Sequence, residues 1–146
     1  MGEISFTGQH RSVQESGELE EWKDKVGLIT VSSGKYYNLP EDEFRTNPNI
    51  NSSLPTILLS SKRNEKSVYG VVSDCEDQND KERTHQAGMI VSFGPKIDDQ
   101  DRIFINSLGE GAIWVCDING NFENGDYITT CEIPGHGMLQ DDDLMH

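Results

Sequence analysis

The sequence has no long hydrophobic run, and this absence limits what the chain can be. Only 34% of its 146 residues are hydrophobic, and no stretch approaches the roughly 18 apolar residues that a membrane-spanning helix requires. The residues after Met1 also lack the apolar core of a secretory signal. We therefore expect neither membrane insertion nor secretion through a signal peptide.

Basic residues are scarce as well. The chain contains twelve Lys and Arg residues and 26 Asp and Glu residues, which gives a formal net charge of −14. Such an acidic surface repels phosphate backbones, so nucleic acid is a poor candidate partner. The sequence contains no phosphate-cradling glycine loop, no CxxC pair and no HExxH motif, and we predict neither a cofactor nor a metal.

Cysteine occurs only three times, as Cys75, Cys116 and Cys131. Three cysteines cannot all pair within one chain, and free cysteines commonly behave as small buried hydrophobic residues. Two interpretations stay open for the last two, namely separate buried thiols or a Cys116–Cys131 bridge that the fold does not require. The odd count favours folding in a reducing compartment.

Turn-forming residues, in contrast, are abundant. Fourteen glycines and many Asn, Asp and Ser residues separate about nine strand-like segments. One helical turn is plausible between Val13 and Lys25, and an amphipathic helix is missing. The pattern predicts a single all-β domain over residues 1–146, an antiparallel barrel or sandwich with long polar loops and at most one short helix.

A central hairpin is the clearest element that we expect, within residues 105–134. Ala112–Cys116 and Tyr127–Cys131 have the composition of its two strands. Asn-Gly turns between them supply residues that tolerate positive φ.

Other elements are expected from the same kinds of signal. A second hairpin should turn at Ser32–Gly34, and residues 74–86 should form a long polar loop. Strands are expected within residues 1–12, which would also link the domain to an upstream segment, and at 26–31, 35–39, 54–60 and 68–73, while residues 88–93 and 102–105 should pair around an acidic turn.

The first group of candidate catalytic residues lies near the N-terminus. Ser5, Thr7, Gln9 and His10 combine hydroxyls, an imidazole and an amide, the groups of a nucleophile, a base and an oxyanion donor. Their spacing is not diagnostic, because such roles are set by geometry and not by sequence position. The alternative interpretation, which the residues alone favour, is a polar strand end whose His10 caps a loop.

Acidic residues form a second group. Two carboxylates in a barrel mouth can divide into an acid and a base, and the candidates are Glu110, Glu123, Asp126 and Glu132. A solvated rim is the simpler interpretation, and Asp126 directly after Gly125 is typical of a turn.

A third group comprises His136, Asp141, Asp142, Asp143 and His146. Its spacing fits no standard zinc or calcium site, and a frayed acidic terminus is the favoured interpretation.

Four segments of the chain resemble a known viral family. They are FTGQHR (Phe6–Arg11), VYGVVSD (Val68–Asp74), INSLGEGAIWVCDINGNFENGDYITT (Ile105–Thr130) and IPGHGMLQDDDL (Ile133–Leu144). The resemblance is to the intramolecular-chaperone autoproteolytic domains, or G2 peptidase family, found at the C-terminal ends of tail-fibre and neck-appendage proteins of phages and large DNA viruses.

The resemblance implies a function. Such domains help a homotrimeric fibre to fold and trimerise, and then cut themselves from the upstream segment of the same polypeptide. The cut would fall around Ser5–His10 or just before Met1, in the virion or the host cytoplasm during assembly. By the same analogy Gln9, Glu110 and Asp126 become catalytic candidates. The alternative is a non-catalytic β-domain that caps, oligomerises or binds a host receptor.

Overall fold

The computed structural model describes residues 9–15, 22–37, 54–87, 90–96 and 100–141, and among these the side chains of all but residues 84–92. Nine strands and a single 3₁₀ turn, η1 (Trp22–Lys25), make up the regular structure of this part of the chain. The all-β prediction is therefore confirmed. The strands are β1 (Gln9–Gln14), β2 (Ile29–Tyr37), β3 (Leu54–Leu59), β4 (Val68–Cys75), β5 (Glu82–Ala87), β6 (Ile90–Pro95), β7 (Ile103–Asn106), β8 (Ile128–Thr130) and β9 (Gly137–Leu139).

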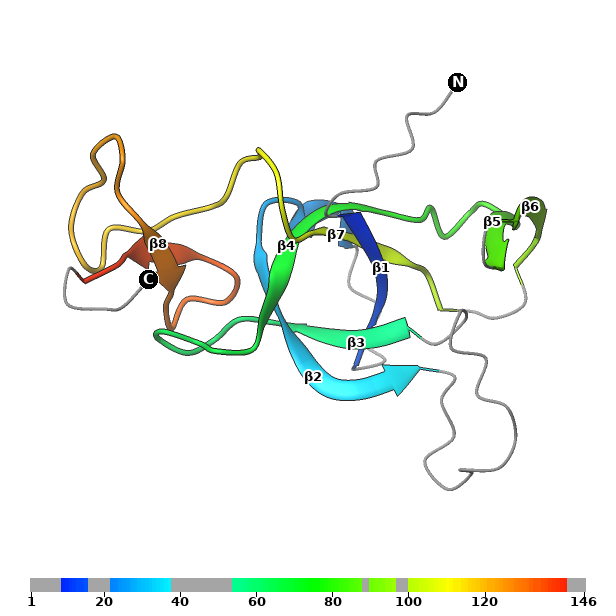
Figure 1. Cartoon of the computed structure of the whole chain (residues 1–146), viewed down its shortest axis with the longest axis horizontal. Coiled ribbons are helices and arrows are strands. Elements are labelled where there is room, and N and C mark those ends of the chain that lie inside the picture. Colours follow the sequence, from blue (N-terminus) through cyan, green and yellow to red (C-terminus); the bar gives the residue numbers. More distant parts are fainter. Residues whose placement is uncertain (1–8, 16–21, 38–53, 88–89, 97–99, 142–146) are drawn as a thin grey trace.

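Five of these strands close into a barrel in the order β1-β3-β2-β4-β7 (Figure 1). Four of the five neighbouring pairs are antiparallel, as the sequence predicts. The exception is β1, which runs parallel to β3 with Val13 opposite Thr56, and antiparallel to β7 with Gln9 opposite Asn106. The first strand therefore closes the barrel between two strands that lie far away in the sequence.

The core of the barrel consists of alternate side chains from these strands. Ile57, Val72, Ile103 and Ile105 are 0–1% exposed and pack together, with Trp22 and Tyr69 against them. β4 approaches β7 closely at Gly70, where a Cβ atom would lie 2.5 Å from the carbonyl oxygen of Asn106. The glycine in the VYGVVS strand is thus required by the close contact of two barrel strands.

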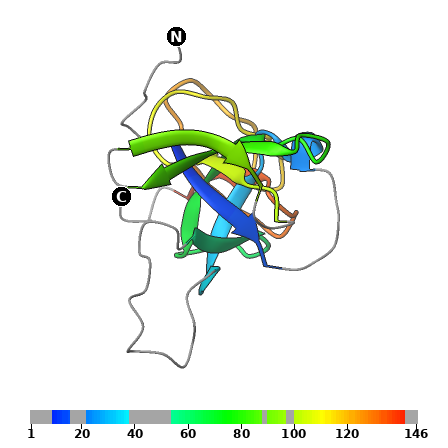
Figure 2. The ribbon, with the colours of Figure 1, turned by 90° about the vertical axis from the view of Figure 1, so that its right-hand side faces the viewer.

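Hairpins β5–β6 and β8–β9 extend the structure beyond the barrel, on opposite sides in Figure 1. β5 and β6 pair from Glu82 opposite Pro95 to Ala87 opposite Ile90, and Figure 2, which views this end, shows the hairpin in front of the barrel. In the described part of the chain, no helix has the length and apolar character to cross a membrane.

The prediction of a hairpin that turns at Ser32–Gly34 is wrong. β2 continues through these residues as one strand, and its register with β3 shifts between Ser32 and Tyr36. Gly34 has a φ of 82°, so the residues that suggest a turn form a bulge instead. Such a bulge bends the strand and lets β2 follow β3 around the barrel.

The predicted central hairpin is also wrong. Ala112–Cys116 is not a strand, because its backbone groups bond elsewhere: Trp114 N–H donates to the Gly27 carbonyl at 3.0 Å and Cys116 N–H to the Gly137 carbonyl at 2.9 Å. β8 does form where the second strand is expected, but its partner is β9, with Thr129 opposite Met138.

Two further expectations are corrected. The predicted loop 74–86 contains the start of β5, and β6 pairs with β5 and not with residues 102–105, because β7 is already paired on both sides by β1 and β4. Strands at 54–60 and 68–73 are confirmed as β3 and β4. The expected N-terminal strand lies outside the described residues until Gln9.

Candidate functional site

A cavity of about 530 Å³ opens between β4, the end of β7 and the segment that follows β7. Ser73 of β4 and Asn106 of β7 line one side of the cavity. Glu110 and Trp114, which belong to the segment 107–114, line the other side. The indole Nε1 of Trp114 donates to the Val26 carbonyl at 3.1 Å, which fixes this wall against the chain before β2. The cavity is therefore built by the meeting of three distant parts of the sequence.

Gln9 reaches this cavity through a serine. Its side-chain Nε2 donates to the Ser73 Oγ at 3.4 Å, and Ser73 Oγ donates to the carbonyl of Phe104 at 3.0 Å. Gln9 also lies opposite Asn106 in the barrel. Ser73, Asn106 and Glu110 all line the cavity, whereas Gln9 does not line it and contacts its wall through Ser73.

His10 belongs to different surroundings. It lies opposite the buried Ile105, next to but on the other face of β1 from Gln9. Its ring packs against Tyr69 with 6.0 Å between the ring centroids, and burial raises the pKa of Tyr69 above its usual value of 10.0. His10 does not line the cavity, and an aromatic neighbour holds it at the barrel end.

Asp126 is a turn residue, as its sequence context indicates. Its Oδ2 accepts a hydrogen bond from the Glu123 N–H at 2.6 Å, and its own N–H donates to the Glu123 carbonyl at 3.1 Å. Glu132 is paired with Arg63 at 3.2 Å. The acidic group is thus divided among three places, and only its member Glu110 lines the cavity.

Ser5 and Thr7 lie outside the described residues, as do Asp142, Asp143 and His146. His136 has its Nδ1 2.9 Å from the Pro134 carbonyl oxygen, and Asp141 accepts a hydrogen bond from Asn119 at 2.8 Å. Within the residues that the structure describes, no group of three or more His, Cys, Asp or Glu side chains is placed to hold a metal ion.

The sequence interpretation missed Ser73 as a site residue. Ser73 stands at the end of the VYGVVS strand with nothing local to distinguish it from any other strand serine. Only the pairing of β4 with β7 and of β7 with β1 brings it next to Gln9. A long-range contact of this kind leaves no local sequence signal.

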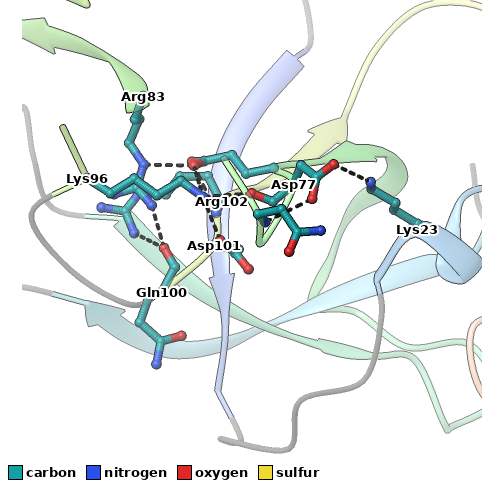
Figure 3. A network of polar contacts seen from close by, with 9 residues as sticks. Lys23, Asp77, Arg83, Lys96, Gln100, Asp101 and Arg102 are labelled. Carbon is teal, nitrogen blue, oxygen red and sulfur yellow. Dashed lines mark hydrogen bonds and ion pairs between the residues drawn. The ribbon is translucent and has the colours of Figure 1, made fainter. Parts of the chain in front are cut away.

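A second missed feature is a network of charges that anchors hairpin β5–β6 (Figure 3). Arg83 donates from Nε to Glu76 at 2.8 Å and from Nη2 to the Gln100 carbonyl at 2.8 Å. Lys96 lies 3.6 Å from Glu76 and 3.1 Å from Asp101. Because the Arg83 side chain is 5% exposed and that of Glu76 12%, this is a buried, structural network.

Seven large apolar side chains within residues 108–133 are exposed. We call them the C-terminal apolar surface, and its residues are Leu108, Trp114, Val115, Ile118, Tyr127, Ile128 and Ile133. Scattered exposed apolar residues are normal, but seven of them along one stretch of chain are enough to support a proposal that this part of the domain contacts a partner.

The cavity contains groups of three chemical kinds. Glu110 supplies a carboxylate that can accept a proton, Ser73 a hydroxyl, and Asn106 an amide donor, while the Gln9 amide contacts Ser73 in the cavity wall. These groups suit the positioning of a peptide bond and the stabilisation of a developing negative charge. No protein family, curated protein or solved structure matches the chain, so the site is interpreted from this geometry.

Proposed function

We propose that this chain is a terminal domain of a viral fibre protein, which assists folding and trimerisation of the fibre and then releases itself by autoproteolysis during assembly. The C-terminal apolar surface carries the proposal. The position of the cavity beside the start of β1 supports its catalytic part, together with the sequence resemblance.

The C-terminal apolar surface suits self-association because its side chains are highly exposed and the sheet next to it is small. Leu108 is 74% exposed, Tyr127 61% and Trp114 60%. The adjacent sheet β8–β9 has two strands of three residues each, and a two-stranded sheet by itself is marginally stable in water. Burial of these side chains between three copies would add to the stability of this small sheet.

The proposal of autoproteolysis depends on where the chain enters the first strand of the barrel. The described chain enters β1 at Gln9, whose amide contacts Ser73 in the cavity wall. A peptide bond just upstream would be covalently tethered near the cavity, and such tethering replaces substrate affinity with a high effective concentration. In this proposal Glu110 accepts a proton from an attacking water, and Gln9 donates to the developing oxyanion.

Intact mass spectrometry tests the cleavage. The protein is expressed with several tens of residues of the fibre upstream of residue 1, and we expect two masses that sum to the precursor plus one water. Glu110→Gln and Gln9→Ala should leave the precursor whole. Asp126→Asn is the matched control and should cut like wild type, because Asp126 closes a turn away from the cavity. Cleavage at the wild-type rate in both cavity variants would refute their catalytic roles.

Analytical ultracentrifugation tests the association. Leu108→Ser should shift the trimer towards monomer while the circular dichroism spectrum stays that of a β-protein. Phe93→Ser is the control. Phe93 is 71% exposed, but it belongs to β6, which lies on the opposite side of the barrel from β8 in Figure 1. A wild-type chain that stays monomeric at high concentration would contradict trimerisation.

One observation favours a second candidate, a non-catalytic domain that caps the fibre, oligomerises or binds a receptor. His10 packs on Tyr69 and Asp126 closes a turn. Among the catalytic candidates that the structure describes, Glu110 alone lines the cavity, and Gln9 contacts its wall through Ser73. Under this candidate the extended protein still forms trimers, but its mass stays that of the uncut precursor.

A further inference from the structure

Two of the three cysteines lie in contact. The Sγ atoms of Cys116 and Cys131 are 3.4 Å apart, although fourteen residues separate them in the sequence. Cys131 is fully buried, and Cys116 is partly exposed. Cys116 is thus the member of the pair with exposed surface, and Cys131 is the buried member.

Backbone contacts on both sides hold this pair in place. Cys116 N–H donates to the Gly137 carbonyl at 2.9 Å, and the Gly137 N–H donates to the Trp114 carbonyl at 2.9 Å. Cys131 donates from Sγ to the His136 carbonyl at 3.4 Å. His136 and Gly137, where β9 begins, therefore contact the two cysteines, and the proximity of the thiols does not depend on a free loop.

The residue before Cys131 is anchored as well. The Thr130 hydroxyl donates to the Lys62 carbonyl at 2.7 Å and accepts from the Glu65 N–H at 2.8 Å. Cys131 consequently has little freedom to move away from Cys116. Two thiols that are held in contact in this manner need only a small movement to reach bonding distance.

We propose that Cys116 and Cys131 form a modification site, a dithiol that a small-molecule disulfide such as oxidised glutathione converts into an intramolecular disulfide. The inference is independent of the proposed function, since it requires neither self-cleavage nor trimerisation.

The reaction proceeds by two thiol–disulfide exchanges. The Cys116 thiolate attacks one sulfur of glutathione disulfide, an S–S bond forms between them, and one glutathione leaves as a thiolate. Cys131 then loses its proton and attacks the Cys116 Sγ, and the second glutathione leaves. The two protein thiols are oxidised by two electrons, and one glutathione disulfide is reduced to two thiols that take up the two protons.

The order of attack follows from burial. Cys116 is the partly exposed member, whereas Cys131 has no exposed surface, and burial raises the pKa of the Cys131 thiol above its usual value of 9.0. Cys131 is therefore suited to resolve the mixed disulfide rather than to start the reaction. Cys75 is a separate, partly buried thiol that lies at the end of β4.

The bond would close a loop that carries part of the C-terminal apolar surface. Ile118 and Tyr127 lie between the two cysteines in the sequence, and β8 ends at Thr130, next to Cys131. A cross-link of this span lowers the entropy of the unfolded chain. Oxidation should therefore raise the unfolding midpoint of the domain.

The test uses the reduced 146-residue chain, which is incubated in glutathione redox buffers, then alkylated and analysed by intact mass and peptide mapping. We expect wild type to lose two hydrogens and two alkylation sites, with Cys116 joined to Cys131 and Cys75 still alkylated. Cys75→Ser should behave identically. Cys131→Ala should stop at a glutathione adduct on Cys116.

Because the buried Cys131→Ala variant is liable to misfold, Cys116→Ser provides the second variant. It should form no intramolecular disulfide, and its unfolding midpoint should not change between oxidised and reduced buffer, whereas that of wild type rises on oxidation. Independent glutathione adducts on wild type, a bridge to Cys75, or thiols that stay reduced in fully oxidised glutathione would each overturn the proposal.

Discussion

Trp114 is bonded to the chain at Gly27, where its backbone N–H donates to the Gly27 carbonyl at 3.0 Å. A Cβ atom at Gly27 would lie 2.9 Å from the Trp114 Cδ1, and the φ of Gly27 is +89°. The two residues therefore meet at a position that only glycine fills without strain. This contact attaches the segment 107–114, one wall of the cavity, to the barrel.

Gly27→Ala should lower the free energy of unfolding by about 1–3 kcal/mol, the usual cost of a strained backbone position. Gly111→Ala is the matched control, because no atom lies within 4 Å of the Cβ it would introduce, and its midpoint should stay close to that of wild type. Chemical denaturation followed by tryptophan fluorescence measures both variants. Equal midpoints for the two would show that the Gly27–Trp114 contact adds little to stability.

Glu76→Gln should destabilise the domain by about 3 kcal/mol, because the substitution removes a buried negative charge that lies against Arg83 and Lys96. Glu76 accepts from Arg83 at 2.8 Å and from the Arg102 N–H at 3.2 Å. Glu132→Gln is the control, as its pair with Arg63 is exposed and such pairs are worth less than about 1 kcal/mol. Similar urea midpoints for both variants would contradict the structural role of the network.

Lys23→Met should raise the pKa of Asp77 without restoring its usual value of 3.8. That pKa is lowered first by the backbone N–H of Asn79, which donates at 2.9 Å, and then by Lys23, whose Nζ lies 3.2 Å from Asp77. NMR titration of the carboxyl carbon measures the change. In concentrated salt, which screens exposed charges, the difference between the two proteins should shrink.

The same pair has a defined effect on acid stability. A carboxyl whose pKa is lowered by folding stabilises the folded state above its unfolded pKa and loses this contribution as the pH falls through the folded value. The stability difference between wild type and Lys23→Met should thus be present at neutral pH, begin to shrink as the pH falls below 3.8, and vanish once the pH is below the lowered pKa of folded Asp77. A difference that persists in strong acid would assign the effect of Lys23 to something other than charge.

Asn124 should deamidate several-fold faster than Asn119, although glycine follows both. Within the described residues, neither the Asn124 side chain nor the Gly125 N–H has a hydrogen-bond partner, so that nitrogen can attack the side-chain amide. Asn119 instead donates to Leu139 at 2.8 Å, and the Gly120 N–H donates to the Asp117 carbonyl at 3.0 Å.

Peptide mapping after incubation at mildly alkaline pH separates the two sites. Asn124→Gln should remove the fast modification and leave that of Asn119 unchanged. Equal rates at the two asparagines would mean that their hydrogen bonds do not control the reaction.

The sequence predicted the fold class well because strand composition and turn residues are local properties. It failed where one residue type serves two purposes. Gly34 marks a turn in many chains, yet here it allows a bulge within β2. The run Ala112–Cys116 has the composition of a strand, but Gly27 and Gly137 take its backbone hydrogen bonds, and no local pattern reveals that.

The candidate site could be predicted only in part for a similar reason. Chemistry and resemblance point to Glu110 and Gln9, and the structure places Glu110 in the cavity lining and Gln9 against its wall. Ser73, which connects Gln9 to that cavity, depends on strand pairings across the whole barrel. His10 was grouped with Gln9 because the two are adjacent in sequence, but strand alternation directs neighbouring residues to opposite faces.

The place of β1 in the barrel has a consequence for how the chain folds as the ribosome makes it. β1 is synthesised before the other barrel strands, yet its partners are β3 and β7, and β7 ends only at Asn106. Non-local pairings are the slow ones, since the intervening chain must be ordered first. The sheet β3-β2-β4 can assemble before β1 has both of its partners. The barrel closes only when β7 has emerged from the ribosome.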